Sequence, residues 1–228
     1  MNIDRLFSLA EQARNLGGRH ESLGSRDWYS IKNAKTDTAT LDIYGPIGIS
    51  YDGEGVTAAQ FVKDLRDVTA SSLDVHINSP GGLVFDGVTI YGALKSHKST
   101  VNVSIDGLAA SAASFVAMAG DDISIQKPAK MMIHDAQGIV IGNASDMHQM
   151  ADLLDELSDT IAEIYSDRTD GTVDEWRTAM QAETWYSAEQ AVASGLADRV
   201  VGDTKAAPES KSSQMIRARA RLLTEGFK

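Results

Sequence analysis

Ile77-Asn78-Ser79-Pro80-Gly81-Gly82 is the segment from which the fold can be worked out. The residues that lead into it, Leu73 to Ile77, alternate apolar and polar side chains, which predicts a β-strand. Proline lacks an amide hydrogen and paired glycines allow backbone angles that a Cβ would block, so the strand has to end here. A helical pattern begins at Val84. Strand, glycine turn and helix in succession can present backbone N–H groups to an anion or an oxyanion, although an ordinary tight turn has the same pattern.

Strands and helices alternate on both sides of this turn, which predicts an α/β fold. The expected strands are 38–44, 73–77, 101–105, 122–126 and 130–133, with a short extended piece at 184–186 and a segment at 197–201 that closes the domain. The expected helices are 57–68, 84–96, 111–119, 143–168, 173–180 and 187–195. Residues 107–110 are predicted to be a turn, Gly120 a helix C-cap, and residues 137–142 a short hairpin.

Three parts of the chain differ in composition. Residues 1–27 begin with a helical pattern over 2–16 and continue as a polar linker, which we interpret as a propeptide or an assembly segment. Residues 28–202 are the predicted globular domain, with a glycine-containing loop at 45–55. Residues 203–228 are predicted to be a linker and a basic tail that carries Arg217, Arg219 and Arg221.

Composition excludes several functional classes. The 228 residues are 43% hydrophobic, and no run is long and apolar enough to cross a membrane. A net charge of −11 argues against nucleic acid and anionic lipid as partners. The absence of cysteine excludes disulfides and thiolate zinc sites, and five histidines without an HExxH motif indicate no metal site. We expect no cofactor and a cytoplasmic location, since no secretory signal is evident.

Ser111 is the candidate nucleophile. It lies where a predicted strand turns into a helix among alanines, so its hydroxyl would be exposed at the start of that helix. A serine in this position is more often only an N-cap. Ser114 competes for the role, but we expect it to face the packed side of the helix.

His134 is the candidate base because it ends the apolar strand 130–133 shortly after that serine. A serine hydroxyl is a poor nucleophile and needs a neighbouring base, and imidazole titrates in the right range. The base in turn needs a carboxylate that fixes its tautomer. Four carboxylates are open by spacing, and sequence separation cannot choose among them. They are Asp106, Asp121, Asp135 and Glu183.

With these residues in view, the chain resembles the Clp protease proteolytic subunit family, within the crotonase-like fold of repeated β-β-α units and a long helix in the C-terminal half. The resemblance covers residues 39–202 and rests on four segments in a consistent order. They are Ile77–Gly82, Gly107-Leu108-Ala109-Ala110-Ser111-Ala112, Met132-Ile133-His134, and the run from Trp185 to Asp198. Leu108 and Ala112 depart from the family's Gln and Met at those positions.

The resemblance implies a role for each matched residue. Ser111 would be the nucleophile, His134 the general base, and the backbone N–H groups of Gly82 and Ala112 the oxyanion hole. The family's aspartate corresponds here to Glu183, which supplies the same charge one methylene further out. The family also implies a ring-shaped homo-oligomer, with the helix 143–168 at subunit contacts.

The segment Trp28–Asn33 and the run Glu183-Thr184-Trp185 are similar to those of ClpP-like head maturation proteases of phages and prophages. That likeness implies scaffold and capsid proteins as substrates, cleaved without an ATPase unfoldase. Two alternatives are a ClpP-like subunit that works with an unfoldase, and an acyl-CoA hydratase or isomerase on the same fold. A Ser–Lys dyad with Lys127 or Lys130, and a non-catalytic assembly protein, are further alternatives.

Overall fold

A computed structural model describes residues 28–48 and 56–202. The expected N-terminal helix and linker, most of the loop 45–55, and the basic tail therefore lie outside the described residues. The strands are β1 (Tyr29–Lys32), β2 (Thr38–Tyr44), β3 (Ser72–Ser79), β4 (Thr100–Ala110), β5 (Asp122–Ile125), β6 (Lys130–Ile133), β7 (Thr184–Ser187) and β8 (Arg199–Val200). The helices are α2 (Ala58–Arg66), α3 (Val84–Lys95), α4 (Ala112–Ala117), α5 (Ala144–Arg168), α6 (Val173–Gln181) and α7 (Ala188–Ala193).

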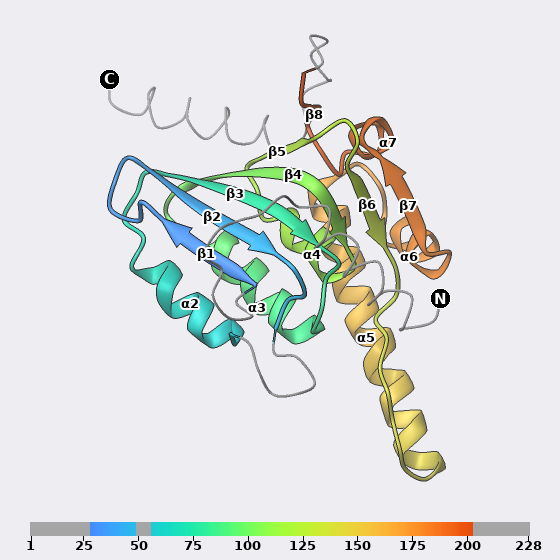
Figure 1. The fold of residues 1–228 in the computed structure, drawn as a ribbon. Helices are drawn as coiled ribbons and strands as arrows, with labels where there is room; N and C mark the ends of the chain where they lie inside the picture. The colour runs from blue at the N-terminus through green and yellow to red at the C-terminus, as the bar shows by residue number, and fades with distance from the viewer. Residues whose placement is uncertain (1–27, 49–55, 203–228) are drawn as a thin grey trace, which may run out of the picture.

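The strands form one mixed sheet in the order β1-β2-β3-β4-β5-β8. β1 is antiparallel to β2, whereas β2 to β5 and β8 are parallel. β4 changes partner along its length, since residues 102–105 pair with β5 and residues 108–110 pair with β6. β6 then pairs with β7 in antiparallel fashion, so the sheet forks at the end of β4 (Figure 1). The α/β fold of ClpP type expected from the sequence is confirmed.

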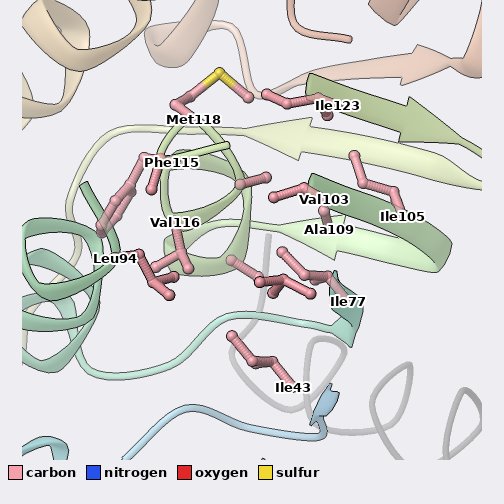
Figure 2. Close-up of a cluster of buried hydrophobic side chains, with 14 of the residues drawn as sticks. Ile43, Ile77, Leu94, Val103, Ile105, Ala109, Phe115, Val116, Met118 and Ile123 are labelled. Atoms are coloured by element: carbon pink, nitrogen blue, oxygen red, sulfur yellow. The ribbon is translucent and has the colours of Figure 1, made fainter. Parts of the chain in front are cut away.

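Helices α2, α3 and α4 cover one face of this sheet (Figure 1). The inward side chains of β2, β3 and the first part of β4 alternate with polar ones, as their burial patterns show. Figure 2 shows how the inward residues of the sheet meet the apolar residues of α3 and α4, among them Ile77, Leu94, Val103 and Phe115. This packing fixes the ends of β3 and β4, where the site residues lie.

β4 is longer than predicted. Residues 107–110 continue the strand, because the register between β3 and β4 shifts after Ile77 and gives β4 extra residues there. Gly107 lies at this irregularity, where a Cβ would come within 2.8 Å of the Asn78 side-chain oxygen. Small residues that indicate a turn in the sequence are therefore residues at which a strand bends toward a new partner.

Three smaller expectations were wrong. The segment 137–142 has no hairpin and runs as an extended chain into α5. The cap residue of α4 is Met118 and not Gly120. β1 was not predicted as a strand at all.

Together with the extended chain before it, α5 projects away from the sheet (Figure 1). None of the helices within residues 28–48 and 56–202 has a window apolar enough to span a membrane.

Candidate active site

Ser111 stands between the end of β4 and the start of α4. Its backbone has φ 52° and ψ −125°, a region that residues with a Cβ rarely occupy. Its N–H donates to the Met132 carbonyl at 2.9 Å, and its own carbonyl accepts from the Ser114 hydroxyl at 2.5 Å. The Ser111 side chain makes no cap hydrogen bond to α4. The hydroxyl is therefore free for another partner, contrary to the N-cap alternative.

Ser114 is fully buried, as expected, and its hydroxyl also meets the Tyr165 hydroxyl at 2.7 Å. Tyr165 belongs to α5, so this contact ties the strained turn at Ser111 to the long helix. Tyr165 belongs to the apolar stripe of α5, so the sequence pattern alone did not indicate this role for its hydroxyl. One signal could have indicated this contact. Tyr165 carries a hydroxyl at a core position of that stripe, and the buried Ser114 needs a hydrogen-bond partner.

The glycine turn after β3 packs directly against Ser111. The buried Ser79 hydroxyl accepts from the Gly81 N–H at 3.1 Å and donates to the Gly45 carbonyl at 2.6 Å, which fixes the turn. Gly81 has φ 92°, and a Cβ there would lie 2.7 Å from both the Ala112 nitrogen and the Ser111 Cβ. Only glycine allows this approach, which brings the two turns together.

The amides of Gly82 and Ala112 lie on these two turns. Within residues 28–48 and 56–202, neither amide donates a hydrogen bond to another protein group, whereas the neighbouring Leu83 N–H bonds to the Ile47 carbonyl at 3.1 Å. Backbone donors without a protein acceptor beside a serine hydroxyl are the requirement for an oxyanion hole.

His134 follows β6 immediately, and its Nε2 lies 2.7 Å from the Ser111 Oγ. Burial lowers the pKa of His134 below its ordinary value of 6.5, against the opposing charges of Glu183 and Asp135. The ring is therefore neutral near neutral pH, which a general base requires. Its Nδ1 is buried, and no hydrogen-bond partner for it exists among the described residues.

Glu183 lies next to His134 through the sheet. The antiparallel register pairs Ile133 with Thr184, so the following residue of one strand faces the preceding residue of the other. Glu183 has φ 49°, and among the residues that the structure describes its carboxylate accepts a single long contact, 3.4 Å, from the Trp185 indole nitrogen. The charge of Glu183 acts on the His134 ring, but its carboxylate does not bond to the Nδ1 in this structure.

The other three carboxylates considered from the sequence have their own partners. Asp106 accepts from His76 at 3.0 Å and from Tyr44 at 2.6 Å. Asp121 accepts from the Val101 N–H, at the opposite end of β4 from Ser111. Asp135 is paired with Arg177 at 2.5 Å. Of these four carboxylates, Glu183 has the weakest hydrogen bond among residues 28–48 and 56–202.

Two further histidines and the two lysines considered for a Ser–Lys dyad have other surroundings. His148 is exposed on α5, and the His97 Nδ1 accepts from the Ser99 N–H. Lys127 and Lys130 are exposed at or before the far end of β6, which leaves no Ser–Lys dyad. In the described part of the chain, no group of three or more acidic or histidine side chains is placed to hold a metal ion.

The site as a whole combines a hydroxyl bonded to a neutral imidazole, two unengaged amides on adjoining turns, and a carboxylate beside the imidazole. This arrangement can attack a carbonyl carbon and stabilise the oxyanion that forms, which is the chemistry of a serine hydrolase.

The chain belongs to the Clp protease family, whose sequence model matches residues 25–204. An ATP-dependent Clp protease proteolytic subunit from Chlorella vulgaris is 36% identical over 135 residues, which cover 58% of this chain and 67% of the relative. The subunit from Pleurastrum terricola is 33% identical over 180 residues, 78% of this chain and 90% of the relative. A proteolytic subunit 1 from Synechococcus sp. (strain CC9902) is 35% identical, covering 75% of this chain and 93% of the relative. The protein is accordingly a serine-type peptidase of the ClpP kind.

Proposed function

We propose that this chain is a ClpP-type serine endopeptidase in which Ser111 is the nucleophile and His134 the general base. The Nε2 of His134 takes the hydroxyl proton while Ser111 Oγ bonds to the peptide carbonyl carbon. The amides of Gly82 and Ala112 bind the resulting oxyanion. The C–N bond then breaks, and the imidazolium gives its proton to the leaving amine. Water attacks the acyl-enzyme in the same way and releases Ser111.

Glu183 completes this mechanism as the orienting carboxylate. Its role requires its side chain to move from the Trp185 indole to the His134 Nδ1, which has no other partner among the described residues. Once bound there, the carboxylate would hold the proton on Nδ1 and stabilise the imidazolium. Ala112 in place of the family's Met does not affect the oxyanion hole, because the main-chain N–H donates the hydrogen bond.

The observation that carries the proposal is the 2.7 Å contact between the His134 Nε2 and the Ser111 Oγ, on a strained turn beside two unengaged amides. A fluorophosphonate probe tests it, since such a probe phosphonylates only an activated serine. We expect labelling at Ser111 in the wild type and none in Ser111→Ala. Equal labelling of the two proteins would refute the assignment.

For the substrate we propose phage scaffold and capsid proteins, cleaved during head maturation in the host cytoplasm or inside the assembling prohead. The support is the likeness of residues 28–33 and 183–185 to such enzymes. Incubation with a co-encoded scaffold or capsid protein, without nucleotide, should give defined fragments with the wild type and intact protein with Ser111→Ala.

The second candidate is a peptidase subunit that receives unfolded chains from an ATPase. The support is the printed name of the relatives, ATP-dependent Clp protease proteolytic subunit. Degradation of a folded substrate only when an unfoldase and ATP are added would favour this candidate over head maturation. In both cases we propose a ring-shaped homo-oligomer, which would bury the exposed apolar side chains on and before α5, namely Ile139, Ile141, Met147 and Leu153.

A further inference from the structure

Arg177 on α6 brings together carboxylates from two other parts of the fold. Its Nη1 lies 2.5 Å from Asp135, its Nε 2.8 Å from Asp159 and its Nη2 3.2 Å from Asp155. The Arg177 side chain is only 14% exposed, whereas Asp155 and Asp159 on α5 are 76% and 62% exposed. One buried guanidinium thus uses all three of its nitrogens, and its shortest contact goes to the residue next to His134.

The chain that follows His134 is held at two successive residues. Asp135 is bonded to Arg177, and the Ala136 N–H donates to the Ser158 hydroxyl on α5 at 2.9 Å. The His134 ring itself has a single hydrogen bond, at Nε2, because its Nδ1 is unpartnered within the described residues. The position of the ring therefore depends on how the backbone after it is fixed.

We propose that Arg177 is a positioning residue for the base. Through its bond to Asp135 it fixes the backbone after His134 between α5 and α6. The same bond turns the Asp135 carboxylate away from the imidazole and leaves the Nδ1 to Glu183. This inference rests on the proposed role of His134.

The charges around the ring give the role a measurable signature. Two carboxylates act on His134, Glu183 from the residue before β7 and Asp135 from its own segment, and both raise its pKa against the effect of burial. Burial raises the pKa of Asp135, and the Arg177 charge opposes that effect. Asp155 and Asp159 are largely exposed, and the Asp155 charge also raises the pKa of Asp135. Removing Arg177 would therefore leave Asp135 unscreened beside His134.

The test is the pH profile of kcat/KM with a peptide substrate. In Arg177→Gln the acid limb should move to higher pH by about half a unit, because an unscreened carboxylate stabilises the imidazolium. In Asp135→Asn the limb should move to lower pH, and the double variant should return toward the wild type. Arg177→Lys should keep the acid limb near its wild-type pH, since lysine keeps the positive charge. Its kcat should fall several-fold, because an ammonium lacks the planar guanidinium that bonds to several carboxylates at once.

Asp159→Asn is the matched control, because it removes an ion pair of Arg177 with an exposed carboxylate whose charge is not among those that shift the pKa of His134. Its acid limb should stay in place. If Arg177→Gln lowers activity no more than Asp159→Asn does and leaves the limb unmoved, Arg177 is only a structural residue and the inference is overturned. Fluorophosphonate labelling separates the two proposals. Absence of label at Ser111 in the wild type defeats the proposed function, whereas normal labelling with an unmoved limb in Arg177→Gln defeats the positioning role alone.

Discussion

His134 and His76 belong to the same sheet, and each has a carboxylate nearby, yet their surroundings differ. The Nδ1 of His76 lies 3.0 Å from Asp106, and this hydrogen bond is the main cause that raises the pKa of His76. The Nδ1 of His134 is unpartnered among the described residues, and burial lowers its pKa. His76 therefore has the better His–carboxylate pair of the two.

The comparison teaches that a histidine bonded to a carboxylate does not identify a catalytic base. What distinguishes His134 is the partner of its Nε2, a serine on a strained turn next to two unengaged amides. His76 projects from the face of β3 opposite Val75 and Ile77, and its side chain is 37% exposed. Its pair with Asp106 stabilises the outer face of the sheet and has no nucleophile to activate.

The largest expected difference between the two histidines lies in activity. His134→Ala should reduce kcat by about 10⁴-fold or more, because the nucleophile loses its base. His76→Ala should leave kcat within about twofold, since other hydrogen-bond partners on the sheet surface remain. Steady-state cleavage of a fluorogenic peptide measures both variants. Comparable losses in the two would erase the distinction drawn between them.

The carboxylate partners are expected to differ next. Glu183→Ala should lower kcat by about 10²- to 10⁴-fold, the range for an orienting carboxylate. Asp135→Ala should have a smaller effect, because Asp135 is occupied by Arg177. Both variants are compared by single-turnover acylation at saturating substrate. A larger loss in Asp135→Ala would transfer the orienting role to that residue.

The opposite pKa shifts sharpen the comparison further. Because the pKa of His134 is lowered, the acid limb of kcat/KM should lie below pH 6.5, with activity falling about tenfold per pH unit beneath it. His76 should titrate above 6.5, because its pKa is raised. NMR of the imidazole Hε1 protons, assigned with His76→Gln and His134→Gln, follows both rings in one titration. The reverse order of the two midpoints would contradict these environments.

Much of the fold could be predicted because β2 and β3 alternate strictly and α2, α5, α6 and α7 start at side-chain caps. β2 has the bounds that its sequence pattern predicts, and α5 begins one residue after Asn143, the residue that caps it. Local patterns could not show the extension of β4 through Gly107, because the register shift against β3 depends on a partner strand far along the chain. Local patterns also could not show that the chain at 137–142 is extended. It lies along α5, with Gly138 near Met150, and this contact depends on another segment of the chain.

The site could be predicted as far as backbone elements determine it. Ser111 and His134 directly follow neighbouring strands, β4 and β6, so their approach follows from topology once the motifs are aligned. The state of Glu183 could not be predicted, because its direction depends on side-chain rotation at a residue with positive φ. Arg177 was missed because its importance comes from three carboxylates on other segments, and a lone arginine on a polar helix face carries no local signal.

The smallest expected effect concerns the stability of the His76 pair. Burial disfavours the ionised Asp106, but hydrogen bonds from His76, Tyr44 and Ser104 outweigh it and lower its pKa. The Asp106 contribution is thus present above its unfolded pKa and lost as pH falls through the lower folded value. The His76 contribution is present below pH 6.5 and lost as pH rises through the raised folded value.

Asp106→Asn should therefore lower the free energy of unfolding by about 1 kcal/mol or less, since the pair is partly exposed and screened. The loss should be larger at about pH 5.5 than at about pH 8.5, because only the acidic condition has both partners charged. Urea unfolding at the two pH values measures it, with Asp122→Asn, which breaks the partly exposed pair with Arg199 away from His76, as the control. A loss independent of pH would mean that Asp106 acts through its neutral hydrogen bonds to Tyr44 and Ser104, and that His76 contributes no charge to the sheet surface.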